Sequence, residues 1–83
     1  MLQKLVMRVR KILEVEVEGL GKRIKEARLA SDKSLEALCG EVGVSRTYWY
    51  DLEKETLKGT LSIENLQAIE KALGVSFGVK FDD

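Results

Sequence analysis

The side chains best suited to chemistry lie in one short stretch, RTYWYDLEK, in the second half of the chain. Arg46, Tyr50 and Lys54 recur at every fourth residue, which is the spacing that places side chains in one row along a helix. If the apolar Trp49 and Leu52 point inward, this row points outward. A guanidinium can donate to the two acceptors on a guanine edge, and a lysine can neutralise a phosphate. The row is therefore suited to recognition by hydrogen bonds and charge.

Residues for catalysis or metal binding are scarce. The chain has no histidine and a single cysteine, Cys39, so neither a disulfide framework nor an ordinary zinc site can form within one chain. The alternating Glu14, Glu16 and Glu18 are typical of the solvent-facing side of an edge strand rather than of an acid–base pair. We therefore expect no enzymatic activity, no metal, no cofactor and no small-molecule ligand.

Length and composition predict one domain spanning residues 1–83, because a chain of this size supports one small core. The composition is 45% hydrophobic and 34% charged, which is typical of a globular protein. No stretch approaches the roughly 20 apolar residues of a membrane span, and the basic, apolar start lacks the features of a signal peptide. We expect a soluble, cytoplasmic protein without membrane contact.

Charge is unevenly distributed although the formal net charge is zero. Residues 1–33 hold nine lysines or arginines against five acids, and residues 34–83 hold five against nine. Such asymmetry can create a basic face that attracts phosphate, because the local field acts on a polyanion.

Four helices are predicted between Gly19 and Gly74, where apolar residues keep helical spacing. Ser34, Ser45 and Ser62 stand where three of these helices should begin, and a serine oxygen there can accept a bond from an unpaired backbone N–H. Gly74 follows the last apolar position, as expected where a helix ends in a left-handed residue. The predicted fold class is mainly α, with four to five helices and short strands at both termini.

Both ends of the chain have the alternating pattern of strands. In ILEVEVEG apolar residues alternate with glutamates, and the tail SFGVKF repeats the alternation. We assign residues 1–18 to an N-terminal strand or arm and residues 77–83 to a C-terminal strand with an acidic tail, and we expect the two strands to pair. Residues 2–12 also fit a helical stripe, although their valines favour a strand.

The segment SLEALCGEVGVSRTYWYDLE has the spacing of a helix-turn-helix. The small Cys39 lets two helices cross closely, and Gly43 can take the positive φ of a tight turn. Together with the landmarks LGKRIKEAR, VGVSR, DLE and ALGVS, residues 20–76 resemble the phage repressor and Cro-like helix-turn-helix family, also called XRE. The resemblance implies a domain that binds double-stranded operator DNA as a homodimer, with its third helix in the major groove.

The resemblance also implies roles for individual residues. Arg28 and Glu53 match positions where family members have a salt bridge between the first helix and the recognition helix. Arg46 and Thr47 match positions that touch base edges in relatives. Independently of the resemblance, the remaining bases are candidates for contacts with the DNA backbone: Lys54 and Lys58 after these positions, and Lys22, Arg23, Lys25 and Lys33 in the region of the first helix. The predicted DNA-binding residues are Arg46, Thr47, Tyr50, Asp51, Lys54, Lys58, Arg23 and Lys33.

Two features depart from the family pattern. Relatives usually have a glutamine that contacts phosphate at the start of the second helix, where this chain has Leu35. Residues 34–53 contain one base, Arg46, against four acids, which gives a local charge of −3. Because phosphate neutralisation supplies most nonspecific affinity, this helix pair cannot supply that affinity unaided.

Two functions are compatible with these residues. The first is a sequence-specific DNA-binding transcriptional regulator, acting as a repressor and as a homodimer. Its interface would use the terminal strands, whose apolar residues exceed what a small helical core must bury. The alternative is a repressor-like fold used as a protein-interaction module or antitoxin-like accessory factor, with weak or no DNA binding. The family resemblance favours the first.

Overall fold

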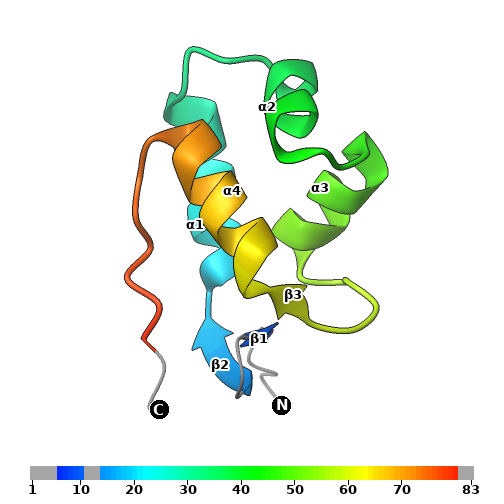
Figure 1. The fold of residues 1–83 in the computed structure, drawn as a ribbon, viewed down its shortest axis with the longest axis vertical. Helices are drawn as coiled ribbons and strands as arrows, with labels where there is room; N and C mark the ends of the chain where they lie inside the picture. The colour runs from blue at the N-terminus through cyan, green and yellow to red at the C-terminus, as the bar shows by residue number, and fades with distance from the viewer. Residues whose placement is uncertain (1–5, 11–13, 81–83) are drawn as a thin grey trace.

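A bundle of helices stands on a small sheet in this protein (Figure 1). The structure is a computed structural model that describes residues 6–10 and 14–80. Within these residues it contains four helices and three strands, which confirms the predicted fold class. The helices are α1 (Leu20–Ala30), α2 (Leu35–Val42), α3 (Arg46–Lys54) and α4 (Ile63–Leu73). The strands are β1 (Val6–Arg10), β2 (Glu14–Glu18) and β3 (Leu61–Ser62).

Local chemistry sets the helix boundaries where the sequence predicted them. The hydroxyl oxygens of Ser34, Ser45 and Ser62 each accept a bond from the backbone N–H three residues further on, at the starts of α2, α3 and α4. Gly43 ends α2 with a φ of 83°, and Gly74 ends α4 with a φ of 69°. These left-handed conformations cost glycine little, because it has no Cβ. The turn between α2 and α3 is therefore tight and well defined.

The core lies where the helices meet one face of the sheet. Trp49 and Leu52 of α3 are fully buried there, against residues of α1, α2, α4 and the strands. Other fully buried side chains are Val9, Leu20, Ile24, Leu38, Leu61 and Ile69. Deleting a buried side chain as large as Trp49 typically costs about 3–5 kcal/mol, so this residue fixes how α3 is rotated.

The sheet has the order β2-β1-β3, with β1 in the centre. Strand β1 pairs with β2 in antiparallel fashion, with Met7 opposite Val17, and with β3 in parallel fashion, with Val9 opposite Leu61. The strand assignment is thus confirmed for residues 6–10 and 14–18. The pairing differs from the expected one, because β1 takes its neighbour in sequence rather than the far C-terminus. A short hairpin closes at a lower entropic cost than a loop through the whole domain.

The C-terminal segment also differs from its prediction. Its described part, residues 75–80, is not a strand. The Phe77 side chain is 7% exposed, its backbone N–H donates to the Glu70 carboxylate at 2.8 Å, and its carbonyl accepts from Arg23 Nη2 at 2.9 Å. Side chains thus occupy both backbone groups of Phe77, the first residue of the predicted strand 77–83. The last three residues of that predicted strand lie outside the described residues.

The apolar residues of the terminal segments serve their own domain. Met7, Val9 and Phe77 are buried in the core, and Val15 and Val17 pack against it. The described apolar side chains that suggested an interface between terminal strands therefore pack within their own domain, and Phe81 lies outside the described residues.

Candidate nucleic-acid interface

Helix α3 divides into a buried face and an exposed face. Trp49 and Leu52 are buried, whereas Arg46, Tyr50 and Lys54 are exposed, as the sequence predicted. Thr47 is exposed beside Arg46, and Asp51 is half-buried. The predicted row of Arg46, Tyr50 and Lys54 therefore lies on the outer surface of the helix.

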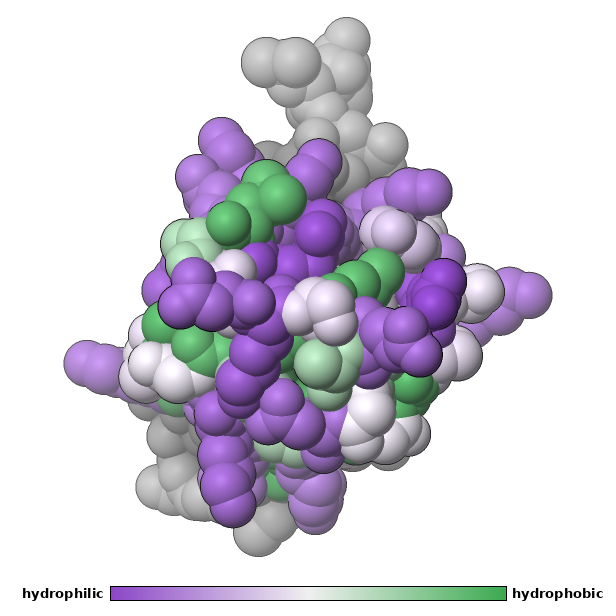
Figure 2. Space-filling view, turned by 90° about the horizontal axis from the view of Figure 1, so that it is seen from above, coloured by the Kyte–Doolittle hydropathy of each residue, from purple (hydrophilic) through white to green (hydrophobic). Residues whose placement is uncertain are grey.

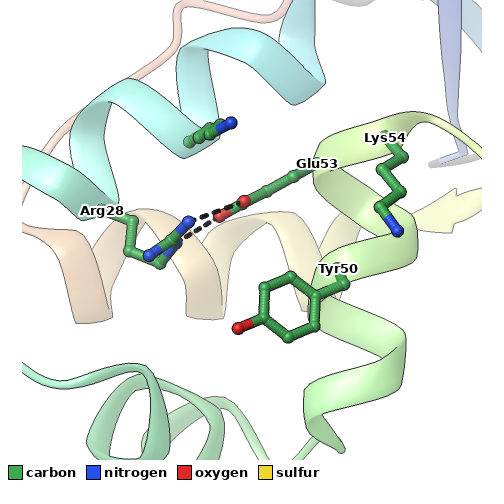
Figure 3. A pocket seen from close by; sticks show the side chains of 5 residues that line it. Arg28, Tyr50, Glu53 and Lys54 are labelled. Atoms are coloured by element: carbon green, nitrogen blue, oxygen red, sulfur yellow. Dashed lines mark hydrogen bonds and ion pairs between the residues drawn. The ribbon is translucent and has the colours of Figure 1, made fainter.

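A partly buried ion pair attaches α3 to α1. Arg28 Nε donates to Glu53 Oε2 at 2.5 Å, and Arg28 Nη2 donates to Glu53 Oε1 at 3.0 Å (Figure 3). Trp49 Nε1 donates to the same carboxylate at 2.7 Å. The hydrogen bond to Glu53 raises the pKa of Arg28 and outweighs the opposite effect of its burial. Removing one partner of such a buried pair costs roughly 3–5 kcal/mol, so the pair fixes the position of α3.

A second, exposed ion pair joins α3 to α2. Arg46 Nη2 lies 3.5 Å from Glu36 Oε2, and the two side chains are 65% and 82% exposed. Exposed pairs of this kind contribute about 0–1 kcal/mol, because water screens them and both side chains lose conformational freedom. Arg46 can therefore leave Glu36 at little cost.

A hollow of about 360 Å³ lies between α1 and the exposed row of α3. Figure 3 shows Tyr50 and Lys54 projecting from α3 beside the Arg28–Glu53 pair at this hollow. Lys25 of α1 also lines it. Because Glu53 balances the charge of Arg28, the positive charge here comes from Lys25 and Lys54. The sequence did not single out Lys25 among the bases of α1. Its place three residues before Arg28, on the same face of the helix, was the signal that could have identified it.

Two residues predicted to contact DNA are engaged elsewhere. Lys33 Nζ donates to the Ala72 carbonyl at 2.8 Å and to Glu41 Oε1 at 2.9 Å, so it lies at the C-terminal end of α4. A lysine there matches the partial negative charge of the helix end. Arg23 binds the carbonyl of Phe77 and lies over its ring, with 5.4 Å from the guanidinium carbon to the ring centroid. The structure does not bring either residue to the α3 row.

Spatial pairing reduces the negative charge counted in residues 34–53. Lys33 pairs with Glu41, and Arg28 pairs with Glu53, from outside that segment. Two acids of the segment remain, Glu36 beside Arg46 and Asp51, whose Oδ1 accepts from Thr56 Oγ1 at 3.3 Å. Lys54 and Lys58, both exposed, add positive charge at the end of α3 and in the loop that follows. The surface around the row is therefore less acidic than the sequence segment suggests.

The end of α3 approaches the start of α1 closely. A Cβ on Gly21 would lie 2.5 Å from the carbonyl oxygen of Glu53, so only glycine fits without a shift. Glu55 ends α3 with a φ of 58°, and its Oε1 is buried without a hydrogen-bond partner. Burial raises the pKa of Glu55, and the backbone N–H of Gly21 opposes part of this rise. These contacts hold the start of α1 against the end of α3.

Neither a metal centre nor a membrane segment emerges from the described residues. No three His, Cys, Asp or Glu side chains gather there as metal ligands, and no helix among them is long and apolar enough to cross a membrane. Cys39 is buried under the α2–α3 turn, and burial raises the pKa of its thiol.

Comparison with known proteins agrees with this arrangement. A family model described as helix-turn-helix matches residues 24–80, which include most of α1 and all of α2, α3 and α4. No curated protein and no solved structure matches the chain.

Proposed function

The chain belongs to the helix-turn-helix family of DNA-binding regulators, and on this premise we propose that it is a sequence-specific transcriptional repressor that acts as a homodimer. Helix α3 would enter the major groove of the operator, which is wide enough to admit an α-helix. The bound dimer would repress by blocking access to the same DNA.

The two-sided character of α3 supports this proposal. Trp49 is fully buried while Tyr50, the next residue, is 44% exposed, so the helix presents one polar face to solvent. The Arg28–Glu53 pair holds this face in a fixed orientation. Arg46 and Thr47 stand at the start of the helix, where side chains reach base edges first. Arg46 would donate to two acceptors of a guanine, and Thr47 would contact a neighbouring base.

Backbone contacts would come from the exposed lysines around α3. Lys54 and Lys25 line one hollow beside the helix, and Lys58 lies in the loop that follows α3. Leu35 cannot replace the phosphate-binding glutamine of relatives, because it is apolar and packs against the core. These lysines would therefore supply most of the sequence-independent affinity.

A homodimer would place two copies of α3 on one side of the duplex. Half-sites one helical turn apart, about 34–36 Å, suit such a pair and give an operator with two-fold symmetry. Sedimentation at a protein concentration of tens of micromolar measures the oligomeric state. A protein that stays monomeric both without and with operator DNA would contradict the homodimer.

Selection from random duplexes is the decisive experiment. We expect enrichment of one short motif, repeated with inverted symmetry and containing a guanine for Arg46. Failure to enrich any motif, under salt conditions where the protein binds DNA, would exclude sequence-specific regulation.

Use of the same fold as a protein-interaction module is the second candidate function. It is favoured by Tyr50, an exposed aromatic side chain beside a hollow. On the face seen in Figure 2, however, apolar side chains are scattered among hydrophilic ones rather than gathered in a patch. A salt titration separates the two candidates, because phosphate contacts make log affinity fall linearly with log salt.

A further inference from the structure

We propose that Glu36 is a positioning residue that determines specificity: it biases Arg46 toward guanine and opposes contact with phosphates. This inference rests on the proposed function, because it assigns the residue that limits where that function acts. Glu36 is one of the four acids that give residues 34–53 their local charge of −3.

Glu36 is placed to orient Arg46 without burying it. It is the second residue of α2, and Arg46 is the first residue of α3. The distance of 3.5 Å from Arg46 Nη2 to Glu36 Oε2 brings the carboxylate beside the side chain that would reach a base first. Glu36 stands in the first turn of α2, where the helix favours a negative charge.

The contact leaves most of the guanidinium available. An arginine has five N–H donors in a rigid fork, and the approach of Glu36 is to one nitrogen, Nη2. The remaining donors can serve the two acceptors of a guanine while the carboxylate stays in contact. The contact is weak, so it favours this orientation of Arg46 without fixing it, and this bias lowers the cost of ordering the side chain in the cognate contact.

A phosphate contact would require a different arrangement. Reaching the backbone takes Arg46 away from Glu36 and leaves a carboxylate near the phosphates, where like charges repel. Glu41 and Glu53 do not share this role, because Glu41 pairs with Lys33 and Glu53 pairs with Arg28. Glu36 thus penalises non-cognate complexes, in which Arg46 has only phosphates to bind, more than cognate complexes.

The test compares Glu36→Gln with the wild-type protein on two duplexes, the enriched operator and a scrambled duplex of equal length. We expect scrambled-duplex affinity to rise roughly three- to tenfold, since one exposed, salt-screened charge is removed. Operator affinity should change less, so the ratio of the two affinities falls. The salt slope on the scrambled duplex should steepen by about 0.9, because Arg46 becomes free to neutralise one phosphate.

Two further variants make the result specific to Glu36 and Arg46. Glu26→Gln removes the same charge from an exposed position of α1 and should leave the affinity ratio unchanged. In an Arg46→Ala background, Glu36→Gln should no longer steepen the salt slope. Thermal unfolding of each variant checks that the fold is retained.

Several outcomes would overturn the inference. An unchanged or increased affinity ratio for Glu36→Gln, or an equal effect of Glu26→Gln, would remove the special role of Glu36. Loss of operator binding with unchanged scrambled-duplex affinity would make Glu36 itself a base-reading residue. If no variant and no wild-type protein enriches a motif, the proposed function fails, and this inference fails with it. An enriched motif with an unchanged ratio rejects the inference alone.

Discussion

Two arginine–glutamate pairs join α3 to its neighbours, and they differ in almost every physical respect. Arg28 and Glu53 meet through two hydrogen bonds, and their side chains are 18% and 5% exposed. Arg46 and Glu36 meet at a single distance of 3.5 Å in solvent. The same two residue types thus occur once as a fixed structural contact and once as a contact that can rearrange.

The difference follows from solvation rather than from residue type. A buried carboxylate that loses its partner retains the cost of leaving water, whereas an exposed one is rehydrated. Glu53 also accepts the indole N–H of Trp49, so its loss would leave two donors of Arg28 and one of Trp49 without this acceptor. The inner pair, Arg28–Glu53, can therefore set the position of α3. The outer pair, Arg46–Glu36, leaves Arg46 free to respond to a ligand.

The largest effect is expected at the inner pair. Glu53→Ala should lower the free energy of unfolding by about 3–5 kcal/mol, because Arg28 and the Trp49 indole lose their acceptor. Glu36→Ala is the matched control and should cost less than about 1 kcal/mol. Urea denaturation measures both. Equal losses for the two variants would show that burial does not distinguish the pairs.

The next effect concerns DNA affinity at the outer pair. Arg46→Ala should weaken operator binding by about 1–3 kcal/mol and relax the preference at one base pair, since the guanidinium contact is lost. Its unfolding free energy should change by less than about 0.5 kcal/mol, because the side chain is exposed. Fluorescence titrations with operators altered at single positions measure this effect.

Arg23→Ala provides the contrasting control for this prediction. Arg23 holds the C-terminal segment through the Phe77 carbonyl, so its removal should cost about 0.5–1.5 kcal/mol of stability. Base preference should be unchanged. A change in base preference in this variant would restore Arg23 to the DNA-binding set that the sequence predicted.

Lys58 and Lys33 differ in the same way, as an exposed and an engaged side chain, in their expected contacts with the DNA backbone. Lys58→Ala should weaken binding to all sequences alike and reduce the salt slope by about 0.9, because Lys58 is exposed in the loop after α3. Lys33→Ala should leave the slope unchanged, because its ammonium group is held by Ala72 and Glu41. The measurement is the slope of log affinity against log salt concentration, between low and moderate salt. Equal slopes for the two variants would contradict the assignment of Lys58 to a phosphate contact.

Features encoded locally could be predicted from the sequence. The serine caps, the positive φ of Gly43 and Gly74, and the burial of Trp49 each depend on residues within one or two turns. The pairing of Arg28 with Glu53 spans 25 residues, and only the family resemblance suggested it.

Contacts between distant residues escaped prediction. Lys33 reaches Ala72 across 39 residues, and Arg23 reaches Phe77 across 54, and neither spacing has a pattern in one sequence. The charge of −3 counted in residues 34–53 was misleading for the same reason, because two of its acids are paired with bases from outside the segment. The two-residue strand β3 is too short to give an alternating pattern.

Two carboxylates at the C-terminal end of α3 differ in their hydrogen bonds, and pH can measure the effect of burial on one of them. Glu53 has three donors, whereas Glu55, two residues later, has a buried Oε1 without a partner. Burial raises the pKa of Glu55 above its ordinary value of 4.5. Between 4.5 and this raised value, the folded protein binds more protons than the unfolded chain, so the contribution of Glu55 to stability falls as pH rises.

The smallest effect on the free energy of unfolding is expected for Glu55→Gln, a change that removes the titrating carboxyl group. Below pH 4.5 the variant and the wild type should differ least, because Glu55 is protonated in both folded and unfolded wild-type protein. As pH rises, the variant should gain stability relative to the wild type, until the difference levels off above the raised pKa. Urea unfolding across pH 3–8 measures the difference, and Glu64→Gln, at an exposed position of α4, serves as the control. A difference that shrinks with rising pH would mean that the fold stabilises the charged form of Glu55, contrary to this prediction.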